Sequence, residues 1–552
     1  MTITKLGLTG ILFVGLFLRF FDLSHLPAGL YWDEMDVGYQ ASSLITTGKD
    51  YFGNALPVFP HSLADYRVPI YTYSSVPFVI ILGLQPLSVR LPAAIWSVVG
   101  LISFYLLLRF WLKSGILAAL GSFSLALSPW HIQYARWASE ASSMFAVFVL
   151  GSACFFRNRL KTASLLMGIS VYTYSPAKFF VPLFLLASIF IYRHSLRRLT
   201  VPGIIISLLL LPLVKDFFWG QTQLRFREIS VFSDPTLSSR IDYLRFQSQV
   251  STASEVRPGM SPGVLEKMLF NKPLELFQTV WSNYLQSLST GFLFLTGDPQ
   301  IRHSPSSSGI GEFLSFEFIA VILGIVYLAL NWQKNKRAFL LLTVWIVISP
   351  LPSAITRDGG MHASRLMFLL PALTILGALG ARYIYDHNRG LLFIYLSSVL
   401  ISGFLVWGWY FTLYRLESPR HFDWGFSDVI SDVLPRRNQY DNIYIDFARD
   451  SGLMAYLFTG DLAPSRFQSL HPLKIETLAP EIDSHVFGNL HFLRPGTRNW
   501  IDLIRLPAFS GHNLFVASAN LPFLDRLSPE TNEYYKKITY PDGSPAFYIF
   551  SP

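Results

Sequence analysis

The stretch Ser88–Leu108, SVRLPAAIWSVVGLISFYLLL, decides the class of protein, because it is long and apolar enough to cross a bilayer. About 20 helical residues span the ~30 Å of hydrocarbon in a membrane. Further apolar runs lie on both sides of this one, although several are short, and together they predict a mainly α polytopic bundle of about 11 transmembrane helices. The runs are 6–23, 88–108, 114–129, 142–156, 162–176, 178–193, 200–214, 314–332, 338–352, 366–385 and 391–412.

The composition agrees with this class. Of 552 residues, 51% are hydrophobic and only 14% are charged, against about 25% charged in an ordinary soluble domain. The mean hydropathy is +0.39. These values exclude a disordered or nucleic-acid-binding chain, and the single cysteine, Cys154, excludes a disulfide framework and a multi-thiolate zinc site.

The positive charges predict the orientation. The chain has 44 Lys and Arg against 35 Asp and Glu, and basic residues occupy the tight connections on one side of the predicted bundle. That side is cytoplasmic by the positive-inside rule. We therefore predict a multi-pass protein of the cell (inner) membrane with a cytoplasmic N-terminus and an extracytoplasmic C-terminus. The connections carry Lys113, Arg157, Arg159, Lys161, Arg193, Arg197, Arg198, Lys334, Lys336, Arg337, Arg382 and Arg389. The first run lacks a small-x-small cleavage site and reads as a retained helix.

Two domains are predicted. Residues 1–412 form the membrane domain, with outer loops at 24–87, 215–313 and 353–365, and residues 413–552 form a small extracytoplasmic α/β domain. Alternating β-type runs occur in this tail, together with a helix-like stretch at Ser427–Leu434 and a turn at Pro541–Gly543. The runs are Asn442–Phe447, His485–Phe492, Asn513–Ala517 and Ala546–Phe550.

The first outer loop brings carboxylates and a guanidinium close to the membrane. Asp33 and Glu34 follow the first run directly, and Arg67 precedes a Val-Pro-Ile-Tyr segment. Asp33 is either a helix N-cap or a carboxylate that acts as a general base or holds a metal. Arg67 either snorkels to the interface or holds a phosphate bidentately.

Further polar residues lie in the next two outer segments. Arg136 and Glu140 are spaced i, i+4, which is typical of a helical ion pair and is also suited to flanking a phosphosugar. The segment Thr296–Pro305 carries Arg302 and His303 and leads into a Ser/Gly-rich stretch. It is either a flexible connection or a lid over a site.

The last short outer loop, Arg357–Arg365, carries His362 and Arg365 directly before an apolar run. Arg365 either anchors that helix at the interface or binds an anion at its N-terminus. Cations from four outer loops and an acidic pair thus gather on one membrane face. A lipid-phosphate substrate requires this arrangement, because its anchor lies in the bilayer and its phosphate lies at headgroup level.

These motifs resemble the integral-membrane glycosyltransferases of the GT-C type, in the protein O-mannosyltransferase and aminoarabinose-transferase (PMT/ArnT-like) superfamily. The resemblance covers most of the membrane part and rests on the order and spacing of several elements. They are Trp32-Asp33-Glu34, Arg67-Val68-Pro69-Ile70-Tyr71, Ser128-Pro129-Trp130 with Arg136 and Glu140, Tyr172–Lys178, Gly297-Asp298 with Arg302-His303, and His362 with Arg365.

The resemblance implies transfer of a monosaccharide from a polyprenyl-phosphate donor to an acceptor hydroxyl or amine on the extracytoplasmic face, with inversion. It implies that Asp33 is the base and that Glu34 orients the acceptor or sugar. Arg67 and Arg136 would contact the donor phosphate. The remaining residues assigned to donor binding are Glu140, Lys178, Arg302, His303, His362 and Arg365.

The cofactor and the acceptor stay open. Asp33, Glu34 and Glu140 offer oxygen ligands of the kind that Mg²⁺ or Mn²⁺ accepts, but no metal motif requires a divalent cation. The acceptor is a lipid, a glycan or a protein, and the absence of a β-trefoil-like repeat counts against a protein. Two other functions use the same outer cations. One is a transporter or flippase of an anionic lipid-linked sugar, and the other is an O-antigen polymerase or ligase.

Overall fold

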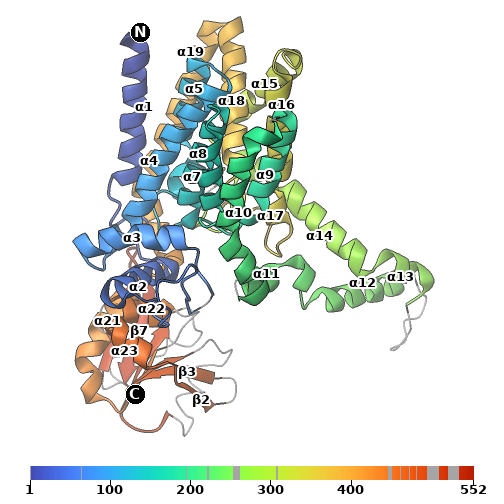
Figure 1. The fold of residues 1–552 in the computed structure, drawn as a ribbon. Coiled ribbons are helices and arrows are strands. Elements are labelled where there is room, and N and C mark those ends of the chain that lie inside the picture. The colour runs from blue at the N-terminus through green and yellow to red at the C-terminus, as the bar shows by residue number, and fades with distance from the viewer. Residues whose placement is uncertain are drawn as a thin grey trace. The chain divides into compact units, whose positions relative to one another are not determined.

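The computed structural model describes the chain except residues 1, 64, 194, 221–222, 253–261, 306–308, 446–450, 460–461, 472, 480–481, 494–508, 520–533 and 552. The described part is mostly helical with one sheet (Figure 1). It divides into two compact units. Unit 1 comprises residues 1–99, 132–143 and 404–552, and unit 2 comprises residues 100–131 and 144–403.

Each of the predicted apolar runs contains a helix. Among the described residues, four helices are long and apolar enough to cross a membrane by length and composition, and shorter apolar helices accompany them. The four are Pro86–Trp111, Arg197–Trp219, Lys336–Ala354 and Arg389–Thr412. The number of spans stays a prediction. The helices in the runs are α1 (Thr2–Phe20), α4 (Pro86–Trp111), α5 (Gly115–Leu127), α7 (Glu140–Phe156), α8 (Leu160–Ser170), α9 (Ala177–Tyr192), α10 (Leu196–Trp219), α15 (Glu317–Leu330), α16 (Lys336–Ile348), α18 (Leu369–His387) and α19 (Arg389–Thr412).

Within unit 2, α15 and α18 pack so closely that glycine is required at the crossing. A Cβ on Gly380 would lie 1.8 Å from the carbonyl oxygen of Ala320, and one on Gly324 would lie 2.1 Å from that of Leu376. Small residues permit such backbone approach between membrane helices. The pair α15–α18 is therefore a fixed part of the helical core, on which α5 and α16 also pack.

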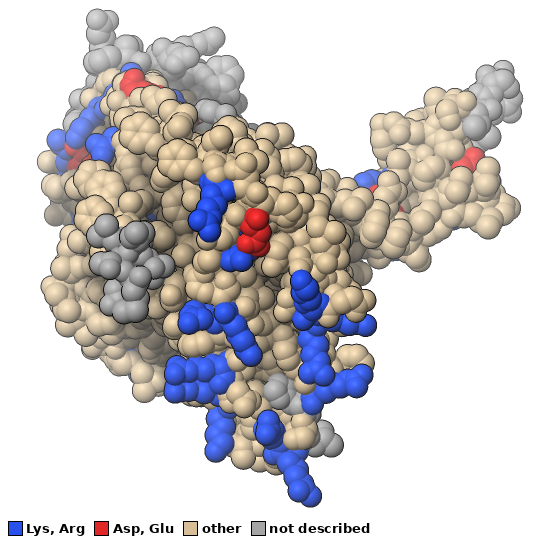
Figure 2. Space-filling model, turned by 90° about the horizontal axis from the view of Figure 1, so that it is seen from above, with Lys and Arg blue, Asp and Glu red and all other residues tan. Residues whose placement is uncertain are grey.

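The basic connections of unit 2 lie at one end of its helices. Trp111, at the end of α4, donates from Nε1 to the hydroxyl oxygen of Tyr192, at the end of α9, over 2.7 Å. Phe156, at the end of α7, stacks on Trp111. Figure 2 views this end and shows Lys and Arg side chains gathered over it, with few acidic ones.

The predicted outer loops and the tail contain short helices. In unit 1 the first loop contains α2 (Trp32–Thr47) and α3 (Pro69–Leu82), and the tail after α19 contains α20 (Tyr414–Glu417), α21 (Phe426–Val433), α22 (Ser451–Phe458) and α23 (Pro464–Ser469). In unit 2 the outer loops contain α11 (Gln223–Ile229), α12 (Leu237–Thr252), α13 (Val264–Leu269), α14 (Lys272–Ser287) and α17 (Leu351–Ala354). These helices are shorter than the apolar runs of about 20 residues that indicate membrane spans, and among them only α21 was predicted.

The tail of unit 1 forms a seven-stranded sheet of order β2-β3-β4-β1-β5-β7-β6. The central strand β1 is parallel to β4 and β5, and the other pairs are antiparallel. The strands are β1 (Asn442–Ile445), β2 (Ile475–Ala479), β3 (Ile482–Phe487), β4 (Leu490–Leu493), β5 (Asn513–Ser518), β6 (Tyr534–Thr539) and β7 (Pro545–Ser551).

The sheet confirms the α/β reading of the tail, with one correction. The predicted single strand His485–Phe492 is wrong, because β3 and β4 form a hairpin there and Gly488 turns the chain with φ of +68°. The predicted helix at Ser427–Leu434 is α21, and the turn at Pro541–Gly543 joins β6 to β7. Phe447, at the end of another predicted run, lies outside the described residues.

The sheet shares its core with α2. Met35, Tyr39 and Val89 belong to the same buried apolar cluster as residues of α21, α22 and the strands. Gly38 lets α2 approach α22, since a Cβ there would lie 2.6 Å from the Phe458 ring. The tail thus holds the helix that carries Asp33 and Glu34. The division of the chain at residue 412 stays a prediction.

Candidate active site

Glu34 ties the first turn of α2 to α4. Its Oε2 accepts the backbone N–H of Tyr31 at 3.1 Å, and its Oε1 accepts that of Ala138 at 2.9 Å. Arg90 donates to both oxygens, from Nε at 2.9 Å and from Nη2 at 3.0 Å. Both side chains of this bidentate pair are 0% exposed. Glu34 is enclosed by protein groups, and its predicted role in orienting acceptor or sugar stays a prediction.

Arg90 was not among the predicted site residues. Besides Glu34, its guanidinium donates to the carbonyl oxygens of Leu23, Pro27 and Gly29, at distances from 2.6 to 3.3 Å. It therefore holds the segment between α1 and α2. A signal was present in the sequence, because a charge inside an apolar run needs a partner or a function. The sequence did not show which partner.

Arg67 joins two carboxylates of α2. Its Nη2 pairs with Oδ1 of Asp33 and its Nε lies 2.8 Å from Oδ2 of Asp36. The guanidinium also lies over the Trp32 ring, 5.3 Å from its centroid. The Asp33 side chain is 26% exposed while that of Asp36 is 0% exposed. Asp33 is therefore the more accessible of the two carboxylates in this cluster.

Asp36 is the buried carboxylate that anchors the cluster. Its Oδ1 accepts from the hydroxyl groups of Tyr51 at 2.5 Å and Ser62 at 3.0 Å. Burial raises the pKa of Asp36, and the charge of Arg67 and the Tyr51 hydrogen bond only partly offset this effect. Burial disfavours the charged form of Arg67, but Asp33 and Asp36 more than compensate, so its pKa is raised. Arg67 therefore remains a cation that fixes the position of Asp33.

The helix-cap reading of Asp33 does not hold, because α2 begins at Trp32 and its N-cap is Tyr31. Asp33 lies within the first turn, where the helix dipole favours negative charge. The Arg67 side chain does not snorkel to an interface, since it is only 6% exposed. Its predicted contact with a donor phosphate stays a prediction.

Arg136 and Glu140 do not share a helix. Glu140 is the first residue of α7, whereas Arg136 lies in the bend before it, so the predicted i, i+4 helical geometry is wrong. The Arg136 side chain is fully buried. It donates to the carbonyl oxygens of Leu18, Phe21 and Leu26 and to the Tyr410 hydroxyl, at distances from 2.8 to 3.2 Å. Glu140 is half-buried and its charge helps to raise the pKa of Arg67, which places it near that cluster.

In unit 2, Asp298, His303 and His362 bring three ligand-type atoms together. These atoms all lie within 4.8 Å of one another, and the three residues are buried. Asp298 Oδ2 lies 3.0 Å from Nδ1 of His303 and accepts the backbone N–H of Ala363 at 2.8 Å. The last contact fixes the loop that carries His362. The sequence predicted a site role for both histidines, whereas Asp298 was noted only as part of the Gly297-Asp298 motif.

His362 is held as a neutral imidazole. Burial, followed by the charges of Arg365 and His303, keeps the pKa of His362 well below its usual range. The neutral ring is the form that binds metals. Two imidazoles and a carboxylate are a donor set that Zn²⁺ or Mn²⁺ accepts. Within the part of the chain that the structure describes, this trio can hold a divalent cation.

Glu312 supports the trio through a hydrogen bond to the backbone of Asp298. Its Oε1 accepts the backbone N–H of Asp298 at 3.0 Å, and burial, reinforced by the charge of Asp298, raises its pKa well above the usual range. Among the described residues, its Oε2 has no hydrogen-bond partner. Its burial therefore favours the neutral form of the Glu312 carboxyl group.

The other predicted cations of unit 2 lie around the same trio. Arg365 pairs with Asp358 at 2.5 Å and donates to the Thr356 hydroxyl at 2.7 Å. Arg302 is half-buried, and its charge contributes to the lowered pKa of His362. The turn before α9 contacts the loop that carries His362, because the Tyr174 hydroxyl lies 2.9 Å from that of Ser364. Lys178 follows this turn, in the first turn of α9.

The predicted residues therefore fall into two clusters. Unit 1 brings together Asp33, Glu34, Arg67 and Glu140, and it uses Arg136 elsewhere. Unit 2 brings together Arg302, His303, His362 and Arg365. The predicted metal ligands Asp33 and Glu34 are engaged by Arg67 and Arg90.

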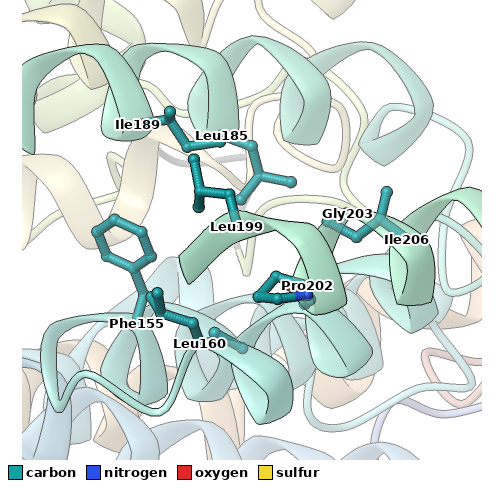
Figure 3. Close-up of a pocket in the computed structure, with 10 residues that line it drawn as sticks. Phe155, Leu160, Leu185, Ile189, Leu199, Pro202, Gly203 and Ile206 are labelled. Atoms are coloured by element: carbon teal, nitrogen blue, oxygen red, sulfur yellow. The ribbon is translucent and has the colours of Figure 1, made fainter. Parts of the chain in front are cut away.

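A separate pocket in unit 2 lies between α7, α8, α9 and α10 (Figure 3). Its volume is about 90 Å³, and Phe155, Leu185, Leu199 and Ile206 are among the side chains that line it. Apart from Ser164, the described lining residues are apolar. The pocket offers no acid, base or cation, and it is not the candidate site.

No protein-family model and no curated protein sequence matches the chain. Solved structures do match in fold. ArnT from Cupriavidus metallidurans bound to undecaprenyl phosphate is similar over 99% of this chain and 97% of ArnT, with 13% sequence identity and a TM-score of 0.51. This likeness confirms the predicted GT-C fold.

The archaeal oligosaccharyltransferase AglB from Archaeoglobus fulgidus, in complex with an inhibitory peptide and a dolichol-phosphate, also matches. The alignment covers 82% of this chain and 63% of AglB, with 13% identity and a TM-score of 0.49. The chain thus spans less than two thirds of the length of the AglB structures that it matches, namely 63% and 64%.

Proposed function

We propose that the protein is a membrane glycosyltransferase that moves a monosaccharide from a polyprenyl-phosphate donor to an acceptor hydroxyl or amine, on a lipid, glycan or protein. The observation that carries this proposal is the Asp33–Arg67–Asp36 cluster in a chain with an ArnT-like fold. A partly exposed carboxylate fixed by a buried guanidinium is suited to take a proton from an acceptor.

The proposed reaction is a single displacement. Asp33 accepts the proton of the acceptor hydroxyl or amine, and the acceptor atom forms a bond to the anomeric carbon. The bond from that carbon to the phosphate oxygen breaks, and polyprenyl phosphate leaves with the electron pair. Attack from the face opposite the leaving group inverts the anomeric configuration. Glu34 and Arg90 position Asp33 by fixing the start of α2.

Cations near the leaving phosphate stabilise the charge that develops on it. Arg302, Arg365 and Lys178 are proposed for this role because they are gathered around one loop cluster of unit 2. Arg67 and Arg136 are weaker candidates, since protein oxygens already engage their guanidinium groups. We assign Arg67 to the positioning of Asp33 and Arg136 to the packing of the segment after α1.

A donor-binding role for Arg302 predicts a specific defect. Arg302→Ala is expected to weaken binding of polyprenyl phosphate by roughly ten- to a hundredfold, because a charge-assisted contact contributes about 1.5–3 kcal/mol. Equilibrium binding of the lipid phosphate to protein in nanodiscs measures this effect. Arg357→Ala, at an exposed arginine of the neighbouring loop, is the matched control. Equal affinity of the two variants would remove Arg302 from donor binding.

We further propose that Asp298, His303 and His362 hold a divalent cation. When bound, it would add positive charge that favours departure of a phosphate. His303→Ala and His362→Ala are each expected to lose most of the bound metal, measured by mass spectrometry of the purified protein. His25→Ala is the control, because that side chain is 78% exposed. Unchanged metal content in both trio variants, or metal-free wild type after expression with added Zn²⁺ and Mn²⁺, would contradict the assignment.

The proposed orientation places the basic end of unit 2 in the cytoplasm and the tail domain, residues 413–552, outside. The gathering of Lys and Arg at that end supports it (Figure 2). The donor lipid and the bilayer are the proposed partners, and nucleic acid is not among them.

A further inference from the structure

The helix α14 of unit 2 has two faces of opposite character. Leu274, Phe277, Trp281 and Leu285 are between 42% and 64% exposed. They are spaced by three, four and four residues, so they form one stripe along the helix. Phe277, Trp281 and Tyr284 also stack on one another, with interplanar angles of 7° and 4°. An ordered aromatic and aliphatic stripe therefore faces away from the protein.

The neighbouring helices continue this apolar surface. On α12, Tyr243, Phe246 and Val250 are 49–58% exposed and again lie on one face, while Leu237 and Ile241 on the opposite face are buried. On α13, each large apolar residue is more than half exposed, at 51–77%. We call residues 237–252 and 264–287 the α12–α14 arm. The α13 residues are Val264, Leu265, Met268 and Leu269.

The opposite face of α14 is fixed to the loop that carries the candidate site residues. Asn283 donates from Nδ2 to the carbonyl oxygens of Ala354, at 3.1 Å, and Thr356, at 2.8 Å. The Ser287 hydroxyl donates to the carbonyl oxygen of Gly360 at 2.7 Å. These contacts set the rotation of α14 about its axis, so the apolar stripe does not turn inward.

The surface fits a bilayer interface better than water. An exposed apolar patch of this extent marks an interaction surface. The helices α12 and α14, of 16 residues each, are not among those long enough to span a membrane. The helix α14 has one apolar and one polar face, and helices of this kind lie in the plane of the interface, where Trp and Tyr are enriched. The arm follows α10, whose spanning window is only 6% buried in the protein and thus faces lipid.

The charges of the arm are nearly balanced. Its four basic residues, Arg240, Arg245, Lys267 and Lys272, face three acidic ones, Asp242, Glu266 and Glu275, and Arg240 pairs with Glu275 at 2.8 Å. Figure 2 shows that the arm, which extends to the right in Figure 1, presents mostly uncharged surface to the viewer. Attraction to anionic headgroups is therefore not the main force.

We propose that the α12–α14 arm docks in the interface of the bilayer, with its apolar stripes among the acyl chains. Through Asn283 and Ser287 this docking fixes the loop 353–360, in which Thr356 accepts a hydrogen bond from Arg365. The membrane thereby sets the position of Arg365. Docking itself does not depend on the proposed function, and only its effect on turnover rests on that function.

Spin labels test the docking directly. In a Cys154→Ala background of the full chain, single cysteines are placed at Phe277, Trp281 and, as a matched control, Ser282, which is exposed on a different face of α14. The proteins are labelled with nitroxide and placed in nanodiscs of phosphatidylcholine. Frequent collision of the nitroxide with oxygen shows that the label lies in lipid. Frequent collision with a water-soluble nickel chelate shows that the label lies in water.

The proposal predicts oxygen access and little nickel access at 277 and 281, with the opposite at 282. Added phosphatidylglycerol or high salt is expected to change these values little. Nickel access at 277 and 281 equal to that at 282 would overturn the proposal. Protection of 277 and 281 from both reagents would also overturn it, because a second copy or another protein would then cover the stripe.

Turnover gives the second readout. Trp281→Ser is expected to lower sugar transfer severalfold in nanodiscs, while Ser282→Ala leaves it unchanged. Normal transfer by Trp281→Ser would refute the coupling to Arg365. If the wild type transfers no sugar, the proposed function fails, but the collision data still decide whether the arm docks.

Discussion

Asp33→Asn is expected to abolish sugar transfer while the protein still folds and binds polyprenyl phosphate. Asparagine keeps the shape of the side chain and removes the group that accepts the proton. Loss of a general base costs between about a hundredfold and ten-thousandfold in rate. Turnover of a labelled donor and acceptor by purified protein in nanodiscs measures the effect, and lipid-phosphate binding shows that the site remains intact.

The control for Asp33→Asn is Asp428→Asn, which changes an exposed acid on α21. This variant is expected to turn over like the wild type. Wild-type turnover by Asp33→Asn would exclude Asp33 as the base. Loss of both turnover and lipid binding would point instead to collapse of the Asp33–Arg67–Asp36 cluster.

Glu34→Ala is expected to destabilise the protein by about 3–5 kcal/mol, because it leaves the buried Arg90 guanidinium without its counter-charge. A markedly lower midpoint of thermal unfolding in detergent would show this. The double variant Glu34→Ala/Arg90→Met should recover part of the loss, since a buried pair replaced by apolar groups is often close to neutral. Unfolding midpoints of both variants equal to the wild type would contradict an anchoring role.

Glu34→Gln separates this anchoring role from the predicted contact of Glu34 with acceptor or sugar. The amide keeps one acceptor oxygen for the Arg90 guanidinium but loses the charge. If Glu34 is an anchor, Glu34→Gln is expected to lower the stability and the turnover of the protein together. A stable variant that has lost turnover would restore the substrate contact that the family resemblance implies.

The helices of the membrane part were predictable because apolar runs such as Ser88–Leu108 carry a strong compositional signal. The short helices α2 and α12–α14 were not, because they carry polar residues among the apolar ones. The apolar helix α3 was not, because its 14 residues are fewer than a span needs. β3 and β4 were fused into one predicted strand, since Gly488 alone marks the turn between them.

The sequence indicated which residues belong to the candidate site, but it did not indicate which of them contact one another. Asp33, Arg67, His303 and His362 stood out as polar groups near an apolar surface. Local spacing said nothing of the contact between Glu34 and Arg90, which are 56 residues apart in the chain. For the same reason it paired Arg136 with Glu140, whereas tertiary packing gives Arg136 backbone carbonyl partners.

Consumption of a lipid-linked sugar by the purified wild type tests the central claim most directly. The protein in nanodiscs is incubated with a panel of radiolabelled polyprenyl-phosphate monosaccharides and an acceptor extract. We expect one donor to lose its sugar to an acceptor with release of polyprenyl phosphate. Binding of donors without cleavage of any of them, together with their movement across the bilayer of proteoliposomes, would contradict the transferase and establish a transporter.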